Sequence, residues 1–125
     1  MAKIKQVILI RRDLKMRRGK EIAQGSHASS AFLVSRLAQS DAKDPLSEVE
    51  RYWVEHGMAK ICLKVNSEDE LLECHQKALE AGLVSHLIRD SGKTEFGGNP
   101  TLTACAIGPD KAQKIDEITR DFSLY

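Results

Sequence analysis

The chain has 125 residues, a length that suits a single domain built around one hydrophobic core. Hydrophobic residues make up 42% of it and charged residues 30%, as in ordinary globular proteins, and no apolar run approaches the roughly 18 residues that a membrane span needs. The net charge is +1, but residues 1–20 hold eight basic and one acidic side chain, whereas residues 41–80 hold ten acidic and five basic ones. The basic end predicts a surface for a polyanion, and the simpler alternative is a solvated charged loop.

The cysteines indicate the compartment and argue against a metal site. Cys62, Cys74 and Cys105 are odd in number, far apart and without a CxxC pair. We therefore expect three buried thiols in a reducing cytoplasm, with no disulfide framework, no zinc site and no other cofactor. The apolar run near the N-terminus is interrupted by Arg11 and Arg12, which is unlike a signal peptide. The expectation is a cytoplasmic protein that does not enter a membrane.

The first predicted elements are a buried strand and a long helix. Residues Ile4–Ile10 are short, β-branched and apolar at their centre, which is typical of a strand buried on both faces. A loop follows over residues 13–18, and a helix is expected from near Gly19 to about Ala38, with small residues around Gly25 that let it approach the sheet closely. The larger apolar residues of this helix are Ile22, Phe32, Leu33 and Leu37.

A second helix and an edge strand come next. Asp44 and Pro45 have the order of a cap and a first helical residue, so they predict a helix that starts there and stops at Gly57. The residues expected on its buried side are Leu46, Val49 and Trp53. In Ala59–Val65 apolar and polar side chains alternate, which predicts a strand with one mostly polar face near the edge of a sheet.

The rest of the chain predicts a helix, two strands and a final helix. Ser67 and Glu70 have the spacing of a capping box at the start of a helix that ends at Gly82. Two strands are expected over Leu83–Arg89 and Thr101–Ile107, separated by a glycine-rich loop. The sequence Gly-Pro-Asp directly after the last strand is expected to start the final helix.

This order of elements predicts the fold class. Strands linked by helices favour parallel pairing with helices on the faces of the sheet, whereas the last two strands, which have no helix between them, favour antiparallel pairing. We therefore expect an α/β fold in which residues 1–125 form a single domain. Its sheet should be mixed and four-stranded, with helices on both faces.

Five polar side chains are expected to meet at one rim of this sheet. Ligands of open α/β sheets bind beyond the carboxyl ends of the strands. The residues expected there are Lys20, Gln24, Asp90, Thr94 and Thr103. Each also has a structural interpretation, since Asp-Ser-Gly is a common turn and threonine is a good strand residue. Lys20 favours a functional site, because a cation in the first turn of a helix opposes the helix dipole.

Three ordered motifs show a family resemblance. GKEIAQGSHA (residues 19–28), GLVSHLIRDSGKTEF (residues 82–96) and TACAIGP (residues 103–109) resemble the peptidyl-tRNA hydrolases of the second type, which are typical of archaea and eukaryotes. The resemblance implies hydrolysis of the ester that joins a peptide to tRNA, and it places the family's functional lysine, glutamine, aspartate and two threonines at the five rim residues. The family often has cysteine at the position of Gly25 and usually arginine at that of Lys93.

The chemistry expected of this site needs no metal. An aminoacyl ester is already reactive, so a positioned water and help for the developing oxyanion suffice. Asp90 would orient or deprotonate the water, and acting as a base would require its pKa to be raised. Lys20 would stabilise the oxyanion or a terminal tRNA phosphate. Gln24, Thr94 and Thr103 would fix the carbonyl group and the water.

A tRNA-binding surface is expected beside the rim. Basic side chains there would hold the tRNA backbone through its phosphates. The residues expected in this role are Arg11, Arg12, Lys15, Arg17, Arg18 and Lys93. Aromatic residues make up 5% of the chain, which argues against recognition by base stacking.

Two functions of other classes stay open at this point. One is an RNA-binding module without catalysis, which would keep the basic surface and perform no chemistry. The other is a protein-interaction adaptor that uses the acidic residues 41–80. The sequence also leaves the oligomeric state open, including a homodimer.

Overall fold

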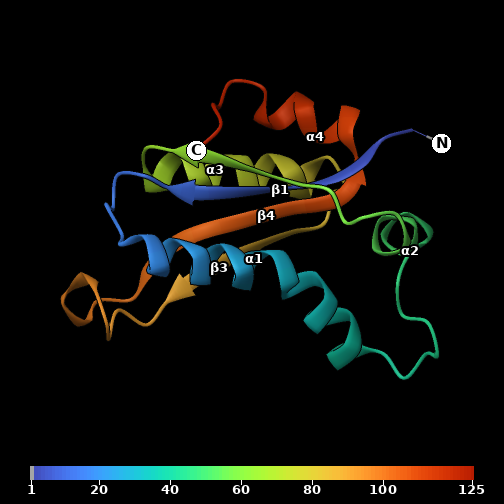
Figure 1. Cartoon of the computed structure of the whole chain (residues 1–125), viewed down its shortest axis with the longest axis horizontal. Coiled ribbons are helices and arrows are strands. Elements are labelled where there is room, and N and C mark those ends of the chain that lie inside the picture. The colour runs from blue at the N-terminus through green and yellow to red at the C-terminus, as the bar shows by residue number, and fades with distance from the viewer. Residues whose placement is uncertain (1) are drawn as a thin grey trace.

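The protein, seen in a computed structural model that describes residues 2–125, has one sheet between two layers of helices (Figure 1). Its elements in chain order are β1 (Ile4–Arg11), α1 (Arg18–Gln39), α2 (Glu48–Glu55), β2 (Lys60–Val65), α3 (Glu68–Glu80), β3 (Ser85–Asp90), the 3-10 helix η1 (Phe96–Gly98), β4 (Thr101–Lys111) and α4 (Ala112–Thr119). Within residues 2–125, no helix combines the length and the apolar character needed to cross a membrane.

The sheet is mixed, as the order of elements predicts. Its strands follow the spatial order β2-β1-β4-β3. β1 pairs in parallel with β2, whereas β4 pairs antiparallel with both β1 and β3. The crossover from β1 to β2 passes through α1 and α2, and β3 reaches β4 through the loop that holds η1. β2 therefore lies at an edge of the sheet, as its alternating sequence indicates.

Alternate side chains of β1 contact the two helical layers, because every residue of this strand is buried. Val7 and Leu9 lie in a core that they share with residues of α3 and α4. Ile8 and Ile10 face the opposite side and pack with α1. Figure 1 shows α1 on one side of the sheet and α3 and α4 on the other. The expected α/β class, with a mixed four-stranded sheet and helices on both faces, is confirmed.

The start of α2 was expected one turn too early. Asp44 and Pro45 lie in the preceding loop, where the Asp44 carboxylate accepts a backbone N–H two residues further on. The helix is capped by Ser47 instead. The Ser47 hydroxyl accepts the N–H of Glu50 at 3.1 Å, and the Glu50 carboxylate accepts the N–H of Ser47 at 3.0 Å. This reciprocal pair is a capping box, and it decides where α2 begins.

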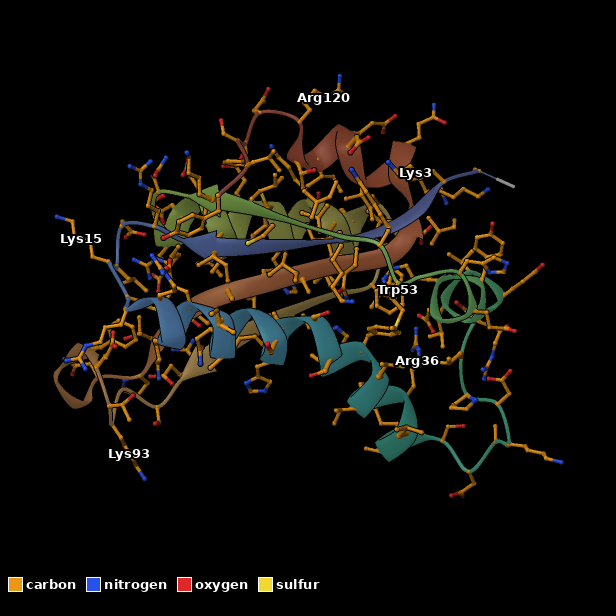
Figure 2. The ribbon with its side chains drawn as sticks, viewed as in Figure 1. Lys3, Lys15, Arg36, Trp53, Lys93 and Arg120 are labelled. Carbon is orange, nitrogen blue, oxygen red and sulfur yellow. The ribbon has the colours of Figure 1, made fainter. Side chains whose placement is uncertain are left out.

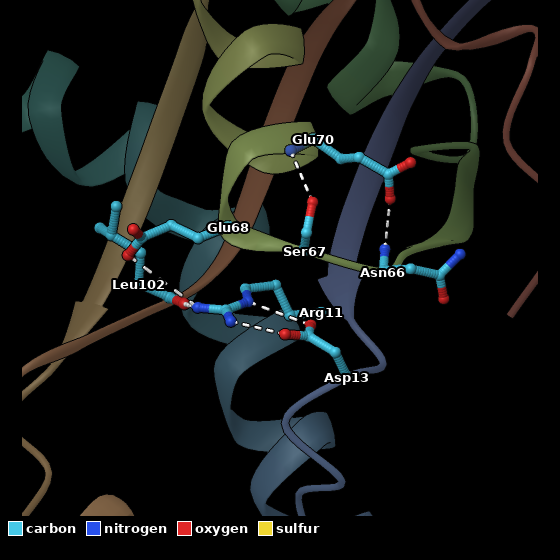
Figure 3. Close-up of polar contacts among 7 residues, drawn as sticks. All are labelled: Arg11, Asp13, Asn66, Ser67, Glu68, Glu70 and Leu102. Carbon is cyan, nitrogen blue, oxygen red and sulfur yellow. Dashed lines mark hydrogen bonds and ion pairs between the residues drawn. The ribbon is translucent and has the colours of Figure 1, made fainter.

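The capping box that the sequence predicts for α3 forms only in half. The Ser67 hydroxyl accepts the N–H of Glu70 at 3.0 Å (Figure 3). The Glu70 carboxylate accepts the N–H of Asn66, at 2.6 Å, in place of that of Ser67. The carboxylate therefore satisfies the donor one residue before the cap, and the helix still starts where expected.

β4 is longer than expected, so the last helix starts later. The Gly-Pro-Asp sequence continues the strand to Lys111, and α4 begins at Ala112. Gly108 has a φ of +93°, and its N–H donates to the carbonyl of Val84 at 2.8 Å. A Cβ at this position would lie 2.9 Å from the carbonyl oxygen of Lys5, closer than real Cβ contacts. Pairing with neighbouring backbone therefore keeps this segment in the sheet.

One cysteine and two large apolar side chains of α1 are more exposed than the sequence suggests. Cys74 and Cys105 are buried, but Cys62 is exposed, so the expectation of three buried thiols was wrong. Cys62 lies on the edge strand β2, beside a groove that separates it from α1. Ile22 and Leu37 of α1 are 63% and 69% exposed, and Ile22 lines the same groove.

Candidate active site

The C-terminal end of β3 and the first turn of α1 meet at a rim of the sheet. The ammonium of Lys20 donates to Oδ1 of Asp90 at 2.8 Å and to Oγ1 of Thr94 at 2.9 Å. The side chains of Lys20 and Asp90 are 16% and 12% exposed, so the ion pair is sheltered but accessible to solvent. We call Lys20, Asp90 and Thr94 the rim trio.

The Asp90 carboxylate is stabilised in its ionised form. The hydrogen bond from Lys20 lowers the pKa of Asp90 below its ordinary value, and so does the N–H of Gly92, which donates to Oδ2 at 2.9 Å. A general base that works near neutral pH needs the opposite shift. Asp90 is therefore suited to accept hydrogen bonds and poorly suited to hold a proton at neutral pH.

Gly92 gives the loop after β3 its shape. Its φ is +82°, and a Cβ at this position would lie 2.2 Å from the carbonyl oxygen of Asn99, which no side chain could tolerate. The carbonyl of Gly92 accepts the N–H of Gly98 at 3.0 Å. The loop is thus closed on itself, and this closure directs the Gly92 N–H at Asp90.

Gln24 and Thr103 form a buried pair next to the rim trio. Gln24 lies one helical turn beyond Lys20 in α1, and the Thr103 hydroxyl of β4 donates to its side-chain oxygen. Thr103 is fully buried and Gln24 is 7% exposed. Asp90 pairs in register with Thr101, two residues before Thr103 on β4. The structure therefore brings all five expected residues to one region, as an open trio and a buried pair.

Five of the six basic residues expected to contact tRNA have exposed side chains. They are Arg12, Lys15, Arg17, Arg18 and Lys93. Figure 2 shows Lys15 and Lys93 projecting from the same end of the molecule. Arg17 is 91% exposed and lies 4.0 Å from a carboxylate oxygen of Glu95, a contact that links the first turn of α1 to the loop after β3.

Arg11 has a different environment from the other five. Its Nε and one terminal nitrogen donate to the two carboxylate oxygens of Asp13, at 3.1 and 2.6 Å. The other terminal nitrogen donates to the carbonyl of Leu102 at 3.0 Å and lies 4.0 Å from Glu68 (Figure 3). Because all three guanidinium nitrogens bond groups within the chain, we leave Arg11 out of the tRNA-contacting set.

Comparison with known proteins places this chain in a family. The model of the family described as peptidyl-tRNA hydrolase PTH2 matches residues 4–125. The chain belongs to the PTH2 family of peptidyl-tRNA hydrolases. The family that the sequence motifs indicate is thereby confirmed.

Curated relatives in the PTH2 family cover nearly the whole chain. A peptidyl-tRNA hydrolase of Methanocaldococcus jannaschii is 42% identical, over 97% of this chain and 99% of its own length. One of Methanopyrus kandleri is 45% identical, over 96% and 97%. A probable peptidyl-tRNA hydrolase 2 of Dictyostelium discoideum is 42% identical over 97% of this chain and 54% of its own.

One solved structure shows the same fold at a much lower identity. It is a protein of unknown function from Agrobacterium tumefaciens, with a TM-score of 0.63 and 14% identity over 100% of this chain and 99% of its own. At this identity the likeness concerns the fold alone.

The packing of α1 on β1 leaves room for a Cβ at Gly25. A Cβ at Gly25 would lie 3.6 Å from Cδ1 of Ile10 and 3.8 Å from Cγ2 of Ile8, which are ordinary van der Waals distances. Glycine is therefore not required at this position by the packing of α1 on β1.

Sequence reasoning missed the supporting contacts of the site. It treated the Asp-Ser-Gly turn as an alternative to a functional Asp90, whereas Gly92 holds that carboxylate by its N–H. It also missed Asp13, which neutralises Arg11. The turn sequence was a usable signal for the first contact, and the short spacing of Arg11 and Asp13 for the second.

Proposed function

We propose that the protein hydrolyses the ester bond of peptidyl-tRNA, releasing free tRNA and peptide, with a water oriented by Asp90 and an oxyanion stabilised by Lys20. The observation that carries this proposal is the contact of Lys20 with both Asp90 and Thr94 at the strand ends, in a chain of the PTH2 family. A cation and a carboxylate held side by side at an accessible rim suit a reaction that moves a proton and develops negative charge on oxygen.

Asp90 acts as an acceptor that orients the water. Because Lys20 lowers the pKa of Asp90, the carboxylate stays ionised at neutral pH and accepts a hydrogen bond from the attacking water. The raised pKa that a strong general base would need is not found. The reactivity of the aminoacyl ester compensates for the weak basicity of Asp90, because the water needs alignment and partial polarisation more than full deprotonation before attack.

Lys20 supplies the positive charge that the transition state requires. An ammonium has three N–H donors, and two of them already contact Asp90 and Thr94. The third is available to the carbonyl oxygen of the ester, where charge develops during attack. Thr94 accepts from Lys20, so its own hydroxyl proton is free to donate to the substrate or the water.

The buried pair completes the site from the side of the sheet. The Thr103 hydroxyl donates to the side-chain oxygen of Gln24, which fixes the orientation of the amide. This orientation turns the amide NH2 group of Gln24 toward other acceptors. In the proposed complex it donates to the carbonyl group or to the water, next to Lys20.

The exposed basic residues bind the tRNA backbone. Arg17 is the N-cap residue of α1 and Arg18 its first residue, just before Lys20, and Lys93 lies between Asp90 and Thr94 in the loop after β3. Phosphates bound by these cations would place the ester next to the rim trio. Of the six residues that the sequence suggests for this role, we leave out Arg11, because its nitrogens bond groups within the chain.

The reaction is proposed to be independent of metal ions. Within residues 2–125, no group of three or more His, Cys, Asp or Glu side chains is placed to hold a metal ion. The donor set at the rim, one ammonium, one carboxylate and hydroxyls, is also poorly suited to chelate one.

One assay tests the proposed function. Purified protein is incubated with N-blocked aminoacyl-tRNA, with and without a chelator, and the release of free tRNA is measured. Equal hydrolysis in both reactions is the expected result. Binding of tRNA without turnover would favour the RNA-binding module, and loss of turnover in chelator that one metal ion restores would overturn metal independence.

A further inference from the structure

Residues 123–125, which we call the edge segment, run along the outer edge of β2. The N–H of Lys64 donates to the carbonyl of Ser123 at 3.0 Å, and the N–H of Tyr125 donates to the carbonyl of Cys62 at 3.1 Å. An antiparallel β-bridge lies between these two bonds. The backbone of Tyr125 is therefore fixed beside the sheet.

The side chain of Tyr125 reaches from this edge to α1. Its hydroxyl donates to the carboxylate of Glu21, a residue 104 positions away that lies in the first turn of α1. The two residues line a groove of about 610 Å³ between α1 and β2, together with Trp53 and Cys62. Glu21 raises the pKa of Tyr125 to about 12, so the hydroxyl keeps its proton at neutral pH.

The start of α1 is not fixed by a side-chain cap. Its N-cap residue, Arg17, makes no side-chain capping hydrogen bond, so the turn lacks a common means of fixing a helix start. Lys20 holds the turn to β3 through Asp90. Glu21, the next residue, holds it to the opposite edge of the sheet through Tyr125. The turn that carries the proposed oxyanion donor is thus anchored from both sides.

We infer that Tyr125 is a positioning residue for ester hydrolysis: by holding Glu21 to the edge of β2, it fixes the first turn of α1 and keeps the Lys20 ammonium aligned with Asp90. This inference rests on the proposed function. Tyr125 acts through Glu21 and Lys20 and makes no contact with the reacting atoms.

Tyr125→Phe removes one hydroxyl and leaves the ring in place. The expected result is a kcat about 3- to 10-fold lower with a KM within about twofold, as for the loss of one hydrogen bond that aligns a transition-state contact. Tyr52→Phe is the matched control. Tyr52 lies in α2, where its ring stacks on His56 at a centroid distance of 3.8 Å, so its hydroxyl should not affect either constant.

Variants of Glu21 separate positioning from general stability. Glu21→Ala should lower kcat as much as Tyr125→Phe does, and the double variant should lower it no further, because both changes break the same bond. Glu21→Gln keeps an oxygen that accepts the Tyr125 hydroxyl, and it should retain most of kcat. Additive losses in the double variant would overturn the inference.

A second readout does not depend on activity. Because Lys20 lowers the pKa of Asp90, loosening Lys20 should raise that pKa toward its ordinary value, which NMR titration of the Asp90 carboxyl carbon measures in Tyr125→Phe. An unchanged kcat together with an unchanged Asp90 pKa would overturn the role of Tyr125. A wild-type protein that hydrolyses no N-blocked aminoacyl-tRNA would overturn the proposed function instead, and the Asp90 titration would still show whether Tyr125 positions Lys20.

Discussion

Lys20 and Arg11 lie in the same part of the molecule and have similar surroundings. Each pairs with an aspartate, Lys20 with Asp90 at 2.8 Å and Arg11 with Asp13 at 2.6 Å. Their side chains are 16% and 10% exposed, so burial does not distinguish them. The sequence predicts both near the same substrate, yet we propose a catalytic role for Lys20 and a structural role for Arg11.

The difference lies in the partners that the two cations bond. Arg11 directs Nε and one terminal nitrogen at Asp13 and its other terminal nitrogen at the carbonyl of Leu102, so all three nitrogens bond groups within the chain. Lys20 directs its hydrogen bonds to Asp90 and Thr94, groups that can themselves hold water or substrate. A basic residue near a site is thus available for function when its partners are groups that can themselves contact substrate, whatever its exposure.

The largest effect should come from the anionic partner of Lys20. Asp90→Ala is expected to lower kcat by about 10²- to 10⁴-fold, the range for loss of a group that aligns or polarises the reacting water. The affinity for deacylated tRNA should stay nearly unchanged. Asp13→Ala, in the other pair, should keep kcat within about twofold at temperatures well below the melting transition. A folded Asp90→Ala variant with full activity would remove Asp90 from the mechanism.

Lys20→Ala should lower kcat by about 10²-fold, because the lost donor faces charge that develops in the transition state. The residual activity should also change its pH dependence. In the wild type Lys20 lowers the pKa of Asp90, so Asp90 stays ionised as pH falls until that lowered pKa is reached. Without Lys20, the acidic limb of the pH–rate profile should move to higher pH. A profile that does not move would mean that the two groups are not coupled in the reaction.

Replacement of both Arg17 and Arg18 by Ala should affect binding more than chemistry. The KM is expected to rise by about tenfold while kcat changes little, since phosphate contacts act equally on ground and transition states. The slope of log affinity against log salt should flatten by roughly one to two units. Hydrolysis over a salt series measures both effects. If kcat fell as far as it does in Lys20→Ala, Arg17 and Arg18 would not have a binding role separate from the chemical role of the rim trio.

Arg11→Ala should have the smallest effect on the reaction and a clear effect on stability. The free energy of unfolding is expected to fall by about 1–3 kcal/mol, because Asp13 and the carbonyl of Leu102 lose their donors. Arg12→Ala changes the adjacent, exposed residue and should stay within about 0.5 kcal/mol. Denaturant melts of both variants measure this difference. An Arg11→Ala protein of normal stability with weakened tRNA binding would return Arg11 to the tRNA-contacting set.

Much of the fold was predictable because it depends on local patterns. The apolar run of β1 and the alternation of β2 identify a central and an edge strand, and the missing helix between β3 and β4 predicts their antiparallel pairing. The five candidate residues follow from the rule that sites form beyond strand ends, together with the family motifs. That these residues meet at one rim could be predicted without knowing any side-chain contact.

The features that the sequence did not predict depend on pairing between distant segments. The environment of Arg11 is set by the carbonyl of Leu102 on β4, and the bond between Tyr125 and Glu21 joins residues 104 positions apart. The start of α2 was decided by competition between two plausible caps, and Ser47 prevails because Glu50 reciprocates its hydrogen bond. Local propensity cannot resolve such choices, since each candidate is acceptable by itself.

The edge segment also protects the edge of β2 against pairing with another copy of the chain. An uncovered edge strand presents backbone donors and acceptors that another chain can pair with. Residues 123–125 occupy the N–H of Lys64 and the carbonyl of Cys62, in the middle of β2. A chain without these residues would present a bare strand with the exposed Cys62 thiol at its centre, and would be prone first to edge-to-edge pairing and then to intermolecular oxidation.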